Sequence, residues 1–284
     1  MDGNRKKPDG RLQFQKERFF SRFCALQVLF QQDFQPEIEW DAQRWSYYLC
    51  MISDVLDEQE EYLPYSLEKQ LSELNDVWKQ QKAAEKALDD LEKLKQDEAS
   101  LPEDERTVEE AMLEEARHTA HTAAFKVEEK AARLLKHSCL QFAQRLVDGV
   151  HAKKEQIDEQ ILLAAKNWRL ERMGRMDLNL MRIAAFELLN KPEPPAVPTP
   201  PATAINEAIE LSKVFCQADS RRFVNGVLDK LRKNNQGEKT ADESVPSAEA
   251  VPTEKDATET QPPEEITEGI CRGKRCCIKS TFMH

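Results

Sequence analysis

The segment DSRRFVNGVLDKL, which starts at Asp219, carries the side chains most suited to binding a single-stranded nucleic acid. Its apolar residues recur at i, i+3, i+4 and i+7, so we predict a helix rather than the tight hairpin that an Asn-Gly pair often marks. Asp219 or Ser220 is then the expected N-cap. Arg221, Arg222 and Phe223 follow in the first turn, where free N–H groups and the helix dipole favour phosphate. An aromatic ring beside arginines can also stack on an unpaired base.

These residues also have purely structural interpretations. Asp219 is first a helix cap. Because a carboxylate repels phosphate, its role at an RNA site would be to orient arginines or to accept a hydrogen bond from a base edge. Phe223 could belong to the core instead of forming a base-stacking platform. Gly226 would lie inside the helix at a cost of about 1 kcal/mol relative to alanine, so we expect another helix to approach closely there.

Two further groups of residues could carry chemistry. Arg175 and Arg182 are seven residues apart, which places them on the same helical face if one helix includes both. Arg182 could contact phosphate or simply pair with a carboxylate. His118 and His121 could offer two metal ligands, but a third ligand is missing, and we prefer a solvated helix face. We therefore predict no catalytic residue, no metal site and no cofactor.

Helices must position these side chains, because no segment alternates with period two for long enough to form a strand. We predict a first helix over residues 16–33 and a second that reaches roughly residue 62. The segment RMDLNLMRIAAFELLN is apolar nearly all round, which predicts a central, buried helix. The segment TAINEAIELSKVF has a helical period as well. The body of the protein is therefore predicted to be all-α.

Residues 66–135 differ in character, because leucines and then alanines recur at helical spacing among many charged residues. The pattern breaks at Pro102. We predict an antiparallel hairpin of two helices that projects from the body. A loosely ordered, charged helical insertion is the alternative, since the alanine-rich second seam would bury little.

The net charge of −11 is unevenly distributed along the 284 residues. Residues 66–135 hold eleven Lys/Arg and eighteen Asp/Glu, whereas residues 136–236 hold sixteen and twelve, a mildly basic balance that is compatible with RNA binding. No apolar run is long enough for a membrane span, and the scattered cysteines are typical of the reducing cytoplasm. The predicted organisation is a flexible basic N-terminal arm (1–15), an N-terminal helical subdomain (16–65), the charged hairpin (66–135), a C-terminal helical subdomain (136–236) and a disordered acidic tail (237–284).

Four segments resemble the bacterial NusB family of transcription antitermination factors: RFCALQVLFQ, LERMGRMDLNLMRIAAFELL, TAINEAIELSKVF and DSRRFVNGVLDKL. The resemblance covers about residues 16–62 and 136–233 and leaves out the hairpin and the tail. It implies an all-α fold of two antiparallel helical bundles, with the hairpin inserted. It also implies a non-enzymatic, cytoplasmic protein that binds single-stranded boxA RNA of ribosomal RNA transcripts. The implied partners are the ribosomal protein NusE, other Nus factors and RNA polymerase.

The resemblance carries specific roles onto residues of this chain. Its RNA-binding positions, with Arg175 added on the same helical face, are Arg18, Arg22, Arg175, Arg182, Asp219, Arg221, Arg222 and Phe223. Its NusE-binding positions are Phe30, Glu171 and Asp177, although Glu171 could simply pair with Arg175. Phe19 and Phe20 stand where the family often has more arginines, so a helical scaffold with weakened RNA binding is the alternative function. In the family bundle, the ends of the first, central and last helices would bring the RNA-binding residues together in one basic patch.

Overall fold

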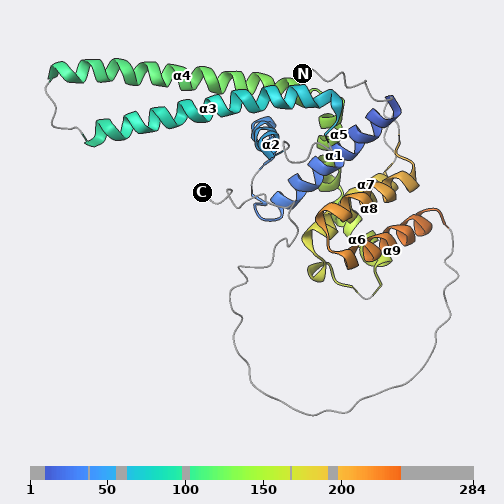
Figure 1. Ribbon diagram of the computed structural model, residues 1–284. Helices are drawn as coiled ribbons and strands as arrows, with labels where there is room; N and C mark the ends of the chain where they lie inside the picture. The colour runs from blue at the N-terminus through green and yellow to red at the C-terminus, as the bar shows by residue number, and fades with distance from the viewer. Residues whose placement is uncertain are drawn as a thin grey trace, which may run out of the picture.

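A computed structural model of the chain describes residues 10–37, 39–55, 63–97, 103–166, 168–190 and 198–237 (Figure 1). The prediction of an all-α protein is confirmed, since the described residues contain helices and no strand. The helices are α1 (Gly10–Gln32), α2 (Ala42–Val55), α3 (Tyr65–Asp97), α4 (Glu103–Leu135), α5 (Ser138–Ala152), α6 (Lys154–Ala164), the 3-10 helix η2 (Leu170–Arg172), α7 (Arg175–Leu189), α8 (Pro201–Phe215) and α9 (Ala218–Asn235). Apart from residue 237, the predicted acidic tail lies outside the described residues, as do residues 1–9 of the predicted arm and residues 56–62 of the predicted second helix.

Helix α7 is the centre of the body. It contacts α1, α5, α6, α8 and α9, and most of its residues are buried. Its sequence, apolar nearly all round, predicts this position because every face of the helix has a neighbour to pack against. Helix α7 therefore sets the positions of the other helices that carry candidate functional residues.

Helix α1 packs against α5, α7 and α8, and it starts at Gly10, earlier than the predicted start at residue 16. All residues from Phe20 to Leu29 are buried. Phe20 itself is fully buried, and Phe19 is half-buried against the same core. Phe19 and Phe20 are thus packing residues in this chain.

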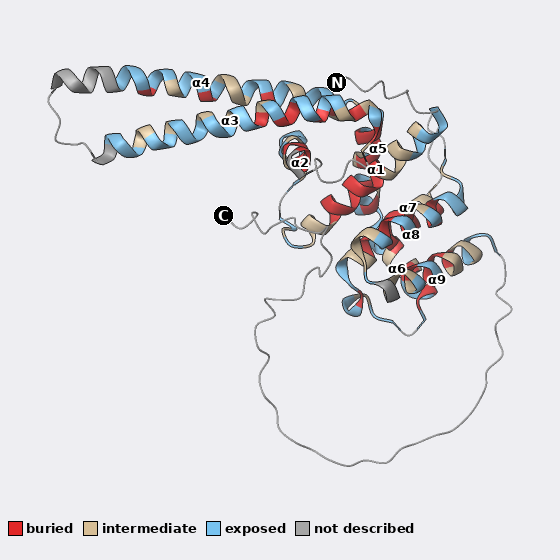
Figure 2. Cartoon of the chain, in the orientation of Figure 1, coloured by how far each residue is buried: buried red, intermediate tan, exposed pale blue. Residues whose placement is uncertain are grey.

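Helices α3 and α4 pack against each other as a long hairpin, and α2 covers its base (Figure 1). Near the base, α3 contributes core residues as far as Trp78, and α4 contributes Val127, Ala131 and Leu134. Farther out, most described residues are exposed (Figure 2). The hairpin is therefore anchored in the core at one end and projects into solvent at the other.

Two expectations about α9 are wrong. The N-cap is Gln217, which makes no side-chain cap hydrogen bond, so neither Asp219 nor Ser220 caps the helix. Asp219 instead lies in the first turn, and its side chain is outside the described part of the structure. Gly226 is exposed, and a Cβ atom built on it would meet nothing within 4 Å. The glycine that does receive a close neighbour is Gly149 of α5, where such a Cβ would lie 2.1 Å from Cζ of Phe186.

Candidate nucleic-acid interface

Near the start of α9, the exposed Trp168 meets Phe223, which is half-buried and packs against the core, beside two arginines; we call Trp168, Arg221, Arg222 and Phe223 the α9 site. The rings of Trp168 and Phe223 are 4.8 Å apart between centroids, and Trp168 is 50% exposed. Arg222 is exposed, whereas Arg221 is half-buried and its Nε has no hydrogen-bond acceptor among the described residues. The site thus presents one exposed and one half-buried ring and positive charge near a helix start that no side chain caps.

A contact with α7 fixes the start of α9. The hydroxyl of Ser220 donates to Oδ2 of Asp177 over 2.9 Å. Asp177 lies in the first turn of α7 and is half-buried, and its Oδ1 is buried without a partner in the described structure. Burial, and then Asp177, raise the pKa of the neighbouring Cys216 thiol. Asp177 thus holds the start of α9 in place through Ser220. The sequence led us to expect that Asp177 binds NusE and did not predict this contact.

Arg22 lies inside the protein rather than on its surface. Its side chain is 2% exposed, and it donates from Nε and Nη2 to the two carboxylate oxygens of Glu187, each over 2.8 Å. Nη1 donates to the backbone oxygen of Arg18. A second carboxylate, Glu207, lies 3.8 Å from Nη1, and burial raises its pKa. The guanidinium of Arg22 is therefore committed to an internal ion pair.

Arg182 is held in the same way in the middle of α7. Its Nε and Nη2 donate to the two oxygens of Asp158 over 2.7 Å each, and Nη1 donates to Asn179 over 2.9 Å. The side chain is 7% exposed, and Asp33 lies 3.8 Å from Nη1. The sequence left two roles open for Arg182, contact with phosphate or pairing with a carboxylate. The structure favours the pairing, because both oxygens of Asp158 bind the guanidinium.

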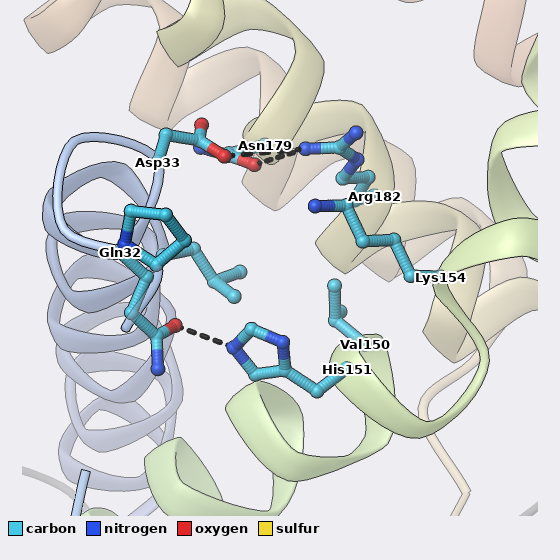
Figure 3. Close-up of a pocket in the computed structure, with 9 residues that line it drawn as sticks. Gln32, Asp33, Val150, His151, Lys154, Asn179 and Arg182 are labelled. Atoms are coloured by element: carbon cyan, nitrogen blue, oxygen red, sulfur yellow. Dashed lines mark hydrogen bonds and ion pairs between the residues drawn. The ribbon is translucent and has the colours of Figure 1, made fainter. Parts of the chain in front are cut away.

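A small cavity borders Arg182 where the ends of α1 and α5 meet α6 and α7 (Figure 3). Its volume is about 230 Å³, and its polar wall includes Gln32, Asp33 and Lys154. His151 forms a hydrogen bond with Gln32 across one side. Burial, followed by the charge of Lys154, lowers the pKa of His151. The polar groups around Arg182 mostly bind one another.

Arg175 connects the start of α7 to the end of α1. Its Nη1 donates to the backbone oxygen of Asp33 over 2.6 Å, and its guanidinium lies 4.6 Å from the ring centroid of Phe34. Phe34 is 57% exposed and meets the half-buried Phe30 edge to face. Arg175, expected to contact RNA, therefore shares a surface with Phe30, expected to contact NusE. Glu171 is exposed on η2.

Arg18 differs from Arg22, although only one helical turn separates them. Its guanidinium lies 3.9 Å from the ring centroid of Phe142 on α5 and 5.0 Å from that of Phe14. Burial, and then the charges of Arg22 and Arg145, lower the pKa of Arg18. Arg18 makes no ion pair with a described carboxylate.

The expected RNA-binding residues therefore do not form one patch. Ser220 fixes the α9 site beside Asp177, whereas Arg22 is bound to Glu187, ten residues farther along α7 and about 15 Å away along its axis. Arg175 and Arg182 occupy a third region beside the end of α1. Sequence reasoning also missed Trp168, which lies in a connecting segment where no helical period marks it.

Comparisons with known proteins point to one family. The sequence profile of the NusB family matches residues 79–233, so the match starts within α3 rather than after the hairpin. The chain is 45% identical over 96 residues to the transcription antitermination protein NusB of Nitratidesulfovibrio vulgaris, which is 34% of this chain and 60% of that protein. It is similar to the proteins of the same name from Trichlorobacter lovleyi (44% over 102 residues, 36% of this chain and 68% of the relative) and Heliobacterium modesticaldum (45% over 111 residues, 38% and 52%). The alignments thus span between 52% and 68% of these three relatives.

Proposed function

Because the chain belongs to the NusB family, we propose that it is a transcription antitermination factor that binds boxA-type single-stranded RNA together with the ribosomal protein NusE. The relatives carry the name transcription antitermination protein, which supports the first half of this proposal. In this role the protein is a binding factor of the cytoplasm, not an enzyme. It acts with other Nus factors on RNA polymerase.

The α9 site is the observation that carries the RNA-binding half of the proposal. Single-stranded RNA exposes unpaired bases, and stacking of one base on an aromatic side chain contributes about 1–3 kcal/mol by alanine substitution. Trp168 and Phe223 offer adjoining rings for such stacking. Arg222 and the uncapped N–H groups of α9 supply attraction for the neighbouring phosphates.

Phe30 and Phe34 support the protein-binding half of the proposal. They form an aromatic pair at the end of α1, and Phe34 is 57% exposed. Exposed aromatic residues and arginines are enriched where proteins bind one another. Arg175, whose guanidinium lies over Phe34, completes this surface for NusE.

Replacing Trp168 by alanine tests the proposal. Trp168 is the most exposed of the four tryptophans, so its loss should leave the fold intact. We expect the affinity for a boxA-containing single-stranded RNA to fall by about 5- to 150-fold, the range that corresponds to loss of one stacked base. Phe125→Ala is the matched control, because Phe125 is 63% exposed on α4 and far along the chain from the α9 site. In the unmodified protein, binding of the RNA should also quench the fluorescence of Trp168.

The affinity should be higher for boxA RNA than for a scrambled strand of equal length, and NusE should raise it further. Equal affinities of Trp168→Ala and Phe125→Ala would remove the α9 site from the proposal. Burial of Arg22 and Arg182 favours a second candidate, a helical scaffold for proteins with weakened RNA binding. Binding without sequence preference and without enhancement by NusE would select this scaffold.

A further inference from the structure

Three arginines surround one phenylalanine where α1 meets α5. Phe142 is 7% exposed, and its ring centroid lies 3.9 Å from the guanidinium of Arg18, 4.8 Å from that of Arg145 and 5.4 Å from that of Arg22. A guanidinium over an aromatic face is held by the negative charge of the ring quadrupole. The ring therefore fixes the positions of several positive charges at once.

The three arginines differ in their hydrogen-bond partners. Arg22 is bound to both oxygens of Glu187, so its charge is neutralised within the protein. Arg18 and Arg145 donate no hydrogen bond to any described residue and form no ion pair with a described carboxylate. A guanidinium has five N–H donors, all of which favour an ionised oxygen as acceptor. With respect to the described residues, Arg18 and Arg145 are thus two cations held by one ring, with N–H donors left for a ligand.

The electrostatics of this cluster favour an anion. Burial is the main cause that lowers the pKa of Arg18, and the next two causes are the charges of Arg22 and Arg145. Arg18 is half-buried, so water screens this repulsion only in part, whereas Arg145 is exposed and open to a ligand. An anion at the two guanidinium groups would relieve the repulsion and accept their hydrogen bonds.

We propose that Arg18 and Arg145, held by Phe142, form a clamp for the phosphodiester backbone of RNA. This inference rests on the proposed function and adds Arg145 and Phe142 to the residues that serve it. Because both guanidinium groups lie within 5 Å of the ring centroid of Phe142, they are near enough to each other for neighbouring phosphates of one strand to contact them. The clamp lies toward the other end of α7 from the α9 site, because Arg22, one turn from Arg18, is bound to Glu187. It therefore holds a separate part of the strand and reads no base.

The salt dependence of RNA binding tests the clamp. We compare the full chain with Arg145→Ala, using a boxA-containing single-stranded RNA at several salt concentrations. Each lost phosphate contact on a single strand should make the slope of log affinity against log salt shallower by about 0.7. Affinity at low salt should fall by about tenfold, as expected for a lost charged hydrogen bond, and equally for boxA and scrambled strands. Arg145→Lys keeps the charge and should retain most of the slope.

Arg117→Ala is the matched control, since Arg117 is 53% exposed on the hairpin and its removal changes the net charge equally. A slope that Arg145→Ala and Arg117→Ala change alike would overturn the clamp while the proposed function stands. Absence of RNA binding by the unmodified chain would overturn both. A third arm measures the thermal stabilisation of each variant by inorganic phosphate. If Arg145→Ala abolishes that stabilisation but leaves the RNA slope intact, the site binds free phosphate and the proposal is wrong.

Discussion

Replacing Arg22 by alanine distinguishes an internal ion pair from an RNA contact. The substitution leaves the carboxylate of Glu187, whose side chain is 5% exposed, without its two hydrogen bonds from the guanidinium. Removing one partner of a buried ion pair typically destabilises a protein by about 3–5 kcal/mol. For a domain of 150–250 residues, each kcal/mol lowers Tm by about 2–4 °C, so we expect a decrease of about 6–20 °C.

Glu207 should add to this loss. Its carboxylate lies 3.8 Å from Nη1 of Arg22. Burial raises its pKa, and Arg22 opposes this shift, whereas Glu187 reinforces it. Without Arg22, two carboxylates would face each other in a half-buried site. A double substitution of Arg22→Met with Glu187→Leu should recover much of the stability, because replacing both members of a buried pair by apolar side chains is often neutral or favourable.

The assay is thermal unfolding for Tm and urea unfolding for the free energy, both followed by circular dichroism, with RNA affinity measured on the folded protein. Arg133→Ala is the control, since Arg133 is 71% exposed and pairs with Glu129 on one helix. Such a surface pair contributes about 0.3–0.5 kcal/mol. Should Arg22→Ala keep normal stability and lose RNA affinity, the ion-pair explanation would be refuted and Arg22 would act on phosphate.

Two further predictions concern the helical body. Gly226→Ala should stabilise the protein by about 1 kcal/mol in urea unfolding because its Cβ meets no atom, whereas Gly149→Ala should destabilise it by about 1–3 kcal/mol because Phe186 must move. If both substitutions shift the midpoint in the same direction, the packing assigned to the two glycines is wrong. Burial and Lys154 lower the pKa of His151, so the folded state takes up its proton less readily than the unfolded state. The stability that neutral His151 contributes should therefore be complete above about pH 6.5 and lost as the pH falls through its folded pKa, and His151→Gln should flatten that part of the stability curve.

The sequence predicted the helical body because its apolar residues follow a helical period that packing preserves. The all-round apolar segment that became α7 is the clearest case, since only a helix with neighbours on every side can bury it. The family motifs added the order of the helices. Helix starts were less predictable: Gln217 at the N-cap of α9 makes no side-chain cap bond, so no sequence signal marks it.

The candidate site was predictable only where exposure follows from local sequence. Arg222 and Phe223 could be placed at the start of α9 from the period of that helix alone. The burial of Arg22 could not be predicted, because its partner Glu187 lies 165 residues away in the chain and no local pattern links the two. The contact of Trp168 with Phe223 and that of Arg18 with Phe142 depend equally on long-range packing, whereas Arg145 and Phe142 lie three residues apart on α5. Types of residue indicate which chemistry is available, but long-range packing decides which guanidinium groups remain free.

The one-sided anchoring of the hairpin has a consequence for the distance at which the protein can hold another molecule. Helix α3 continues from Trp78, its last residue in the core, to Asp97, which corresponds to about 28 Å at 1.5 Å per residue. That length is close to the diameter of a small folded domain. Because α4 runs beside α3 and ion pairs such as Lys130 to Glu73 and Arg117 to Glu92 join them, the pair acts as a spacer of defined length. A molecule held at its tip would leave room for another of that size between itself and the helical body.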